Sequence, residues 1–379
     1  MTLLIFLLIL SILVLIHEFG HFISAKKLRV RVEEFGLGIP PRIFGKKIGE
    51  TTYSINALPF GGFVRLYGED SENPTEDQKT SPRSFLNKTP LQRFVIIVAG
   101  VTMNFLLAIS CFYVLFLSTG FNSLSIPLFF DYKFSFGKSI PLNTVVSGFS
   151  DNSSAKNAGV KYGEAVISID DVKVTNVQEI RDAVKDKPNQ DVSVLLKDLR
   201  INSDKGLRRL VIRTIAGENG QGILGVYVSE SVTLYYSNKI TAPFQHSYNV
   251  LAYSSYAFKE FIKLSFKTKS VEPVSAGVAG PVGIYSVIGS ILSFGGKDAV
   301  LGLVDFIGIL SLSLALINIL PLPALDGGRL AFITAEIIKG KPIDQRFETT
   351  IHKWGMIFFF GLLFLVTIKD IFNLLPIKG

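Results

Sequence analysis

The sequence has few of the residues expected in a secreted or a nucleic-acid-binding protein. Its 379 residues include one cysteine, Cys111, so no disulfide can form within one chain. Only four histidines and one tryptophan occur, and charged residues make up 18% of the chain. The formal net charge is +8, but the basic residues are dispersed and no recognition motif accompanies them. We therefore expect no nucleic-acid partner and attribute the charge to loops that face an anionic lipid bilayer.

Apolar residues, by contrast, make up 48% of the chain and form four long runs. The runs cover residues 2–25, 94–119, 301–320 and 354–368. Because a helix needs about 20 apolar residues to cross a bilayer core, they predict a multi-span membrane protein. The first run has no basic residue before it and no small-residue cleavage site, so we expect a retained span rather than a signal peptide.

Basic residues next to the runs predict the orientation of the chain. Lys and Arg residues follow the first run, precede the second, and lie between the third and the fourth. Short cytoplasmic loops are enriched in these residues. We therefore expect the loop of residues 26–93 in the cytoplasm and both termini outside it.

The fold class expected is an α-helical membrane protein with four transmembrane helices, a cytoplasmic membrane-associated β-region and an extracytoplasmic α+β domain. The short β-type runs and glycines of residues 30–67 indicate the β-region. The expected segments are a first span (1–25), a cytoplasmic loop with the β-region (26–93), a second span (94–119), an α+β domain (144–229), amphipathic connecting helices (241–298), a third span (299–329) and a fourth span (352–375).

The most informative motif is His17-Glu18-Phe19-Gly20-His21 in the first run. Histidines at positions i and i+4 share one helix face and can bind one zinc ion, while the glutamate after the first histidine can act as a general base. A chance pair of helical histidines is the alternative. His17 lies nine residues before Lys26, about 14 Å along the helix, and charged groups at that depth in a membrane indicate function.

A catalytic zinc usually has three protein ligands and a water, so a third ligand is needed. His246 and His352 are poor candidates, because the orientation above places one outside and the other at the start of the fourth span. Asp326 follows Pro321 and Pro323 at the end of the third run, which runs in the same direction as the first. Asp326 could instead belong to an ordinary turn, but beside the histidine pair it is the predicted third ligand.

These two motifs together resemble the site-2 protease family, and more closely its bacterial regulator of sigma-E protease group. The resemblance covers nearly the whole chain and implies one zinc ion held by His17, His21 and Asp326, with Glu18 as the base. It implies a bacterial inner-membrane protease that cuts single-span membrane proteins within their transmembrane segment, such as anti-sigma factors or remnant signal peptides.

The same resemblance implies a role for the β-region and a PDZ-like domain. The β-region would pair with the unwound substrate, and Gly61, Gly62 and Asn318 would help to bind it; Asn318 could equally bond the backbone at a helix break. Residues 145–227 resemble a PDZ domain, which would either bind peptide termini or exclude bulky outer domains.

Two other functions fit part of the pattern. A membrane-bound zincin could cut misfolded proteins at the cytoplasmic face, with Glu336 as the third ligand. A non-enzymatic scaffold could bind partners through the PDZ-like domain and hold a structural metal, but such a site would need four protein ligands and no Glu18.

Overall fold

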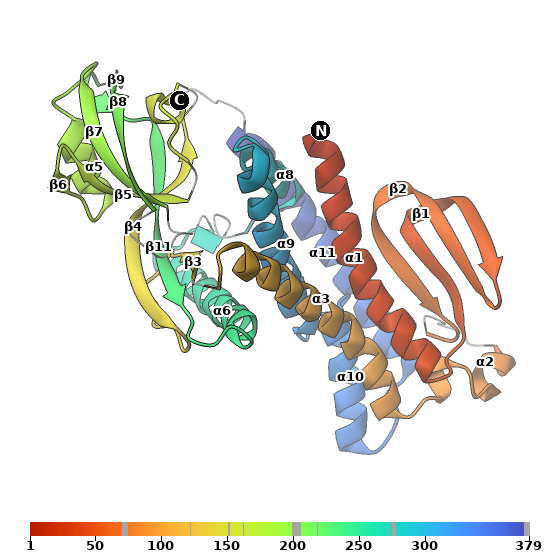
Figure 1. The fold of residues 1–379 in the computed structure, drawn as a ribbon. Coiled ribbons are helices and arrows are strands. Elements are labelled where there is room, and N and C mark those ends of the chain that lie inside the picture. The colour runs from red at the N-terminus through yellow and green to blue at the C-terminus, as the bar shows by residue number, and fades with distance from the viewer. Residues whose placement is uncertain are drawn as a thin grey trace. The chain divides into compact units, whose positions relative to one another are not determined.

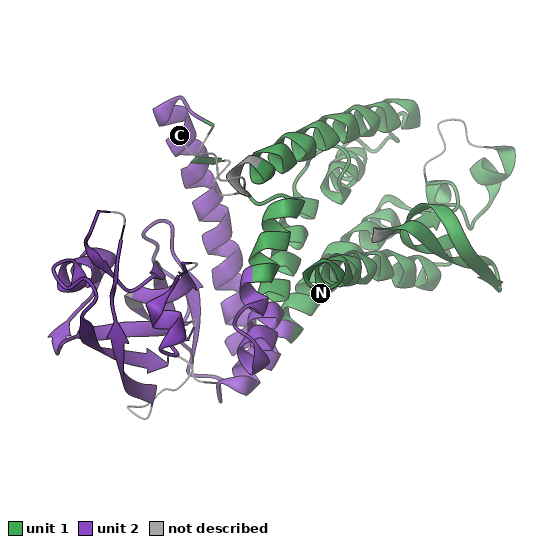
Figure 2. Cartoon of the chain, turned by 90° about the horizontal axis from the view of Figure 1, so that it is seen from above, with its two compact units in different colours: residues 1–110, 271–289, 306–379 green, residues 111–270, 290–305 purple. Residues whose placement is uncertain are grey.

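The computed structural model describes residues 1–69, 75–121, 123–150, 152–161, 163–198, 206–217, 219–271, 273–274 and 278–374. Residue 375, the predicted end of the fourth span, lies outside the described residues. So do residues 272 and 275–277 of the predicted connecting helices. The chain forms two compact units (Figure 2). Unit 1 comprises residues 1–110, 271–289 and 306–379, and unit 2 comprises residues 111–270 and 290–305.

Four helices in the described part of the chain are long and apolar enough to cross a membrane, in agreement with the four predicted spans. They are α1 (Thr2–Lys27), α3 (Pro90–Ser118), α9 (Gly296–Ile319) and α11 (Gln345–Leu374), labelled in Figure 1. The end of α9 lies ten residues before residue 329, the predicted end of the third span. Pro321 and Pro323 lack an N–H and cannot continue the helix, so a separate helix, α10 (Asp326–Lys339), begins after them.

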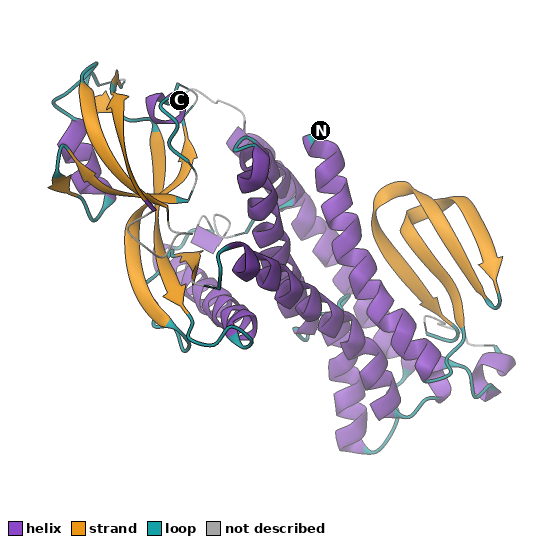
Figure 3. Cartoon of the chain, in the orientation of Figure 1, coloured by secondary structure: helices purple, strands orange, loops and turns teal. Residues whose placement is uncertain are grey.

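Helix α1 stops where the chain turns into the β-region. The Leu28 N–H donates to Ser24 O (2.9 Å), and the Val30 N–H donates to Ala25 O (2.8 Å). Arg29 between them has a left-handed conformation (φ 58°), which ends the helix. Two long strands follow, β1 (Val32–Ile48) and β2 (Thr51–Leu66), shown in orange in Figure 3.

The pairing of β1 with β2 leaves a free edge on each side of the sheet, one formed by residues 62–66 of β2 and the other by residues 42–48 of β1. Residues 34–37 of β1 pair on one side with residues 52–55 of β2 and on the other with residues 62–65. The last part of β2, residues 62–66, is called the edge segment here, because β1 is its only strand partner among the described residues. Its second row of backbone groups is therefore free of strand pairing.

A buried apolar cluster fixes the helices of unit 1 against the β-region. It combines residues from the end of α1, both strands, the 3-10 helix η1 (Phe85–Asn87), α3 and α10: Ala25, Val30, Val32, Leu66, Phe85, Ile96, Ile97, Leu330 and Ile333. Such burial contributes about 25 cal/mol for each Å² of apolar surface removed from water. An ion pair between Arg93 and Glu336 (2.6 Å) adds a second link between α3 and α10. A short helix, α2 (Glu76–Thr80), lies in the loop after β2.

A short apolar helix, α8 (Pro281–Leu292), begins in unit 1 and is held at its first turn by α11. The Asp370 carboxylate accepts the N–H groups of Gly280 (2.8 Å) and Gly283 (2.9 Å). These are N–H groups that a helix start leaves without an internal partner. A Cβ at either glycine would lie about 3 Å from that carboxylate, so the contact needs glycine at both positions.

Unit 2 contains an antiparallel sheet in the order β3-β11-β4-β5-β7-β8, with β6 paired to β5. Its strands are β3 (Ser123–Pro127), β4 (Lys138–Phe149), β5 (Glu164–Ile169), β6 (Val172–Lys173), β7 (Asp191–Asp198), β8 (Leu207–Arg213) and β11 (Val226–Tyr235). A separate pair joins β9 (Ile215–Ala216) to β10 (Gly222–Ile223). The larger sheet packs against α5 (Val177–Val184). Their shared core includes Ile169, Val194 and Leu196 from the strands and Ile180 and Val184 from the helix. A one-turn helix, α4 (Ser154–Asn157), precedes β5.

The long helix α6 (Ala242–Thr268) is anchored to the rest of unit 2 by buried polar groups. His246 bonds Tyr236 through its Nδ1 (3.0 Å), and the Asn249 side chain donates to the same hydroxyl (3.1 Å). Burial lowers the pKa of His246 to about 3, so this ring is neutral. His246 is thus part of the packing of α6.

Candidate metal centre

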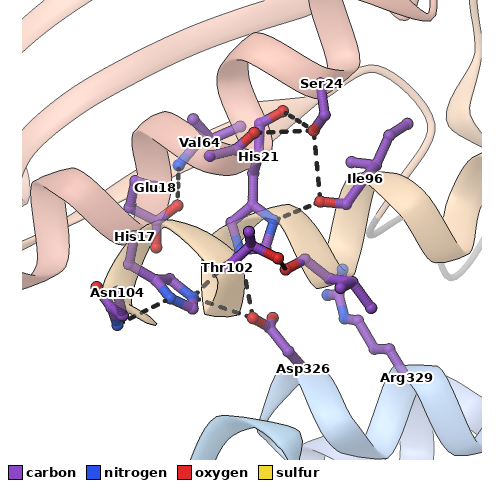
Figure 4. A network of polar contacts seen from close by, with 12 residues as sticks. His17, Glu18, His21, Ser24, Val64, Ile96, Thr102, Asn104, Asp326 and Arg329 are labelled. Carbon is purple, nitrogen blue, oxygen red and sulfur yellow. Dashed lines mark hydrogen bonds and ion pairs between the residues drawn. The ribbon is translucent and has the colours of Figure 1, made fainter. Parts of the chain in front are cut away.

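The first two candidate ligands share one face of α1. His17 and His21 lie one turn apart on that helix, and their Nε2 atoms are 3.2 Å apart. His17 is 8% exposed, and the rings meet edge to face. Figure 4 shows both rings directed toward the start of α10. The i, i+4 spacing in the sequence therefore does bring two imidazoles to one point.

Asp326 is the first residue of α10, and it meets the histidine pair. Its Oδ2 lies 3.0 Å from His17 Nε2 and 3.3 Å from His21 Nε2. Among the described residues these three are the group that could hold a metal ion.

The arrangement of protons indicates that a cation fits between these atoms. His21 Nδ1 lies 2.9 Å from the carbonyl of Ile96, which can only accept, so the neutral ring has its proton on Nδ1 and a lone pair on Nε2. That lone pair faces the Asp326 carboxylate. Ligand atoms that lie about 2.0–2.1 Å from a tetrahedral zinc ion are about 3.3 Å from one another. The separations of His17 Nε2, His21 Nε2 and Asp326 Oδ2 match this value. The donor set, two imidazoles and one carboxylate, is also typical of catalytic zinc.

Two glycines allow α1 and α3 to approach closely at this point. A Cβ on Gly20 would collide with the carbonyl of Ala99, and a Cβ on Gly100 would collide with both imidazoles. The backbone of α3 therefore lies directly against the histidine pair. This contact requires glycine at the fourth position of the His17-Glu18-Phe19-Gly20-His21 motif. Zinc binding by itself would allow other residues at that position.

We predict that Gly100→Ala disturbs the centre more than an equal change elsewhere in a span. The added methyl group must push the two imidazoles apart, and a displacement of about 1 Å in a reacting group can lower the rate on the order of 10²-fold. Gly361→Ala in α11 is the matched control, because nothing lies within 4 Å of its Cβ position. Zinc content and proteolytic rate of both purified variants measure the effect. Equal loss in both would contradict the geometry.

The loop before Asp326 is held by His352, which is a poor metal-ligand candidate by sequence. His352 Nδ1 accepts the N–H of Ala324 (3.0 Å), a residue with φ 74°. Gly327 and Gly328 have no room for a Cβ, because the carbonyls of Leu320 and Leu322 lie against them. The glycines after Asp326 thus let α10 start tightly against the loop, which aims its first side chain at α1 (Figure 4).

Glu18 has a different partner from the neighbouring histidines. Its Oε2 accepts the backbone N–H of Val64 at 3.0 Å, as Figure 4 shows. Val64 belongs to the edge segment, so this N–H is one of the groups left free by strand pairing. The predicted base is therefore oriented by the β-region, which no feature of the sequence indicated.

Other predicted residues lie at varying distances from this group. A Cβ on Gly62 would lie 3.8 Å from Glu18 Cγ, so the edge segment passes beside the base. Gly61 precedes it with φ 86°, and Asn318 is half-buried in the last turn of α9. Glu336, the alternative third ligand, is instead paired with Arg93. An ion pair between Arg329 and Glu69 joins α10 to the turn after β2.

Comparison with known proteins identifies the family. The profile of peptidase family M50 matches residues 5–362. A protein of Clostridium perfringens assigned as a zinc metalloprotease is 32% identical over 96% of this chain and 97% of its own length. The regulator of sigma-W protease RasP of Bacillus subtilis is 27% identical over 98% of both chains. The zinc metalloprotease RasP of Bacillus licheniformis is 27% identical over the same shares. The chain belongs to peptidase family M50, the site-2 protease family, and is a zinc metalloprotease with several candidate membrane spans.

Proposed function

We propose that the chain is an intramembrane endopeptidase that cuts single-span membrane proteins within their transmembrane segment. His17, His21 and Asp326 hold the zinc ion, and Glu18 is the general base. The observation on which the proposal depends most is the position of the three ligand atoms. They converge at α1, a helix long and apolar enough to cross a membrane, about 14 Å along that helix from Lys26. With α1 in a bilayer, a site at this depth would be closed to a soluble substrate.

Zinc, when bound, supplies a Lewis acid that lowers the pKa of a coordinated water to near neutrality and polarises a carbonyl group. Glu18 takes up the proton of the attacking water and returns it to the leaving amine. The N–H of Val64 fixes one oxygen of the Glu18 carboxylate, which leaves the other oxygen for this proton. His21 is held in the ligand tautomer by the Ile96 carbonyl.

The edge segment is the proposed docking site for the substrate backbone. A transmembrane helix must unwind before its peptide bond can be attacked, and its freed N–H and C=O groups then need partners. An extended peptide can pair with a free sheet edge. Residues 62–66 offer such an edge beside Glu18. Gly61 and Gly62, at the start of this edge, are further proposed substrate contacts. Asn318 at the end of α9 is a further proposed substrate contact.

The proposed orientation places the metal toward the cytoplasmic side of a bacterial inner membrane. Lys26 and Lys27 close α1, and short loops rich in Lys and Arg stay in the cytoplasm. The termini and the α+β domain of residues 144–229 then lie outside. We propose that this domain is PDZ-like and excludes substrates with bulky outer domains. Like RasP, named as a regulator of sigma-W protease, the chain would serve regulated proteolysis, of anti-sigma factors or of remnant signal peptides.

The position of the cut tests this function. We expect the protein in proteoliposomes to cleave a single-span substrate, tagged at both ends, between residues of its apolar segment. Mass spectrometry of the two fragments locates the bond. A soluble unfolded protein with the same tags serves as the control and should stay intact. Cuts confined to the polar flanks, or equal cleavage of the soluble control, would favour a zincin that acts at the membrane surface.

A further inference from the structure

A third polar group beside the histidine pair comes from α3. Asn104 is fully buried, and its side-chain amide lies 3.3 Å from Nδ1 of His17, the ring nitrogen that faces away from Asp326. The amide nitrogen faces the ring. The amide oxygen is buried and has no hydrogen-bond partner among the described residues.

The two possible orientations of this amide have opposite consequences for His17. If the nitrogen donates to Nδ1, the proton of the neutral ring must be on Nε2, which lies 3.0 Å from Asp326. The ring could then offer no lone pair to a metal. If the amide is turned by 180°, its oxygen accepts the Nδ1 proton and Nε2 is free to bind. This turn changes the shape of the side chain very little.

The pattern on α3 favours the second orientation. Ile96, Gly100 and Asn104 follow each other at four-residue spacing, so they share one helix face. Ile96 presents a carbonyl oxygen to Nδ1 of His21, and Gly100 leaves room for both rings. Asn104 stands in the same relation to His17 as the Ile96 carbonyl does to His21. The other side of Asn104 is fixed as well, since its backbone oxygen accepts the hydroxyl of Ser311 (2.8 Å).

We infer that Asn104 is a positioning residue for the metal centre: its side-chain oxygen accepts the Nδ1 proton of His17 and so holds Nε2 as a ligand. This inference rests on the proposed role of His17 in zinc binding. Partners of this kind orient ligating histidines in many zinc sites, and their loss typically lowers metal affinity roughly 10- to 100-fold.

Zinc affinity of the full-length protein in detergent, measured by competition with a chelator, tests the inference without using activity. Asn104→Leu removes the acceptor but keeps the size of the side chain, and Asn104→Asp keeps an acceptor. We expect roughly 10- to 100-fold weaker zinc binding in Asn104→Leu and affinity close to wild type in Asn104→Asp. Ser311→Ala is the control for packing, since it removes the bond to the Asn104 backbone and leaves the side chain in place.

The absorption spectrum of the cobalt-substituted protein provides a second measurement. A changed ligand field in Asn104→Leu, with a wild-type spectrum in Asn104→Asp and Ser311→Ala, supports the inference. Wild-type zinc affinity in Asn104→Leu, or an equal loss in all three variants, overturns it. His17→Ala separates this result from a failure of the proposed function: if it binds zinc as tightly as wild type, His17 is not a ligand.

Discussion

Glu18→Gln should abolish proteolysis while the protein keeps its zinc. The amide cannot accept the proton of the attacking water, and loss of a general base typically lowers the rate about 10²- to 10⁴-fold. The two side chains have nearly the same shape, and the amide oxygen can still accept the N–H of Val64. Cleavage of a tagged single-span substrate in proteoliposomes and zinc content by atomic emission measure the two properties on one preparation.

Glu76→Gln provides the control for this variant. Glu76 is exposed in α2, and its side chain pairs with a neighbouring lysine, Lys79, and with no other side chain among the described residues. The same chemical change there should therefore leave the rate unaltered. A Glu18→Gln variant that cleaves within tenfold of the wild-type rate would show that Glu18 is not the base. Loss of both zinc and cleavage would instead assign Glu18 to the binding of the metal.

Asp326→Ala should lose zinc as well as cleavage. Asp326 is the one carboxylate among the three converging groups, and without it two imidazoles must hold the ion. Removing a direct ligand should weaken binding by more than the roughly 10- to 100-fold that loss of an outer partner costs. The fall in affinity is measured by chelator competition on the full-length protein in detergent.

Glu336→Gln distinguishes this ligand set from the alternative one. Glu336 lies on the same helix as Asp326, but it bonds Arg93 at 2.6 Å. We expect Glu336→Gln to keep wild-type zinc affinity, with a loss of stability from the broken ion pair. The opposite pattern, zinc lost with Glu336 and kept without Asp326, would reject the assignment and restore the membrane-bound zincin.

The sequence allowed prediction of the three converging residues because each depends on local rules. Helical periodicity places His17 and His21 on one face. The helix break at Pro321 and Pro323 and the shared direction of the first and third spans point to Asp326. The start of a separate helix at Asp326 is not predicted, since the expected third span extends to residue 329. The four apolar runs correspond to four long helices for the same reason, since length and hydropathy suffice to predict them.

The partners of these residues could not be predicted, because they come from contacts between distant segments. The Val64 N–H is a backbone group, which every residue has, and only the strand register shows that it is free to reach Glu18. The Ile96 carbonyl is also a backbone group, so the sequence does not show that it bonds His21. The sequence does contain a signal for Asn104, because it is a polar amide within an apolar run, four residues after a glycine. Only the crossing of α1 and α3 reveals its partner.

The ligand atoms come from opposite ends of the chain, and this has a consequence for assembly. With His21 and Asp326 as ligands, the metal closes a loop of roughly 300 residues, and closing long loops restricts the unfolded chain most. Binding free energy at such a site is in part folding free energy. An ion bound there would act as a cross-link between α1 and α10, so we expect the apoprotein to be less stable than the zinc-bound form.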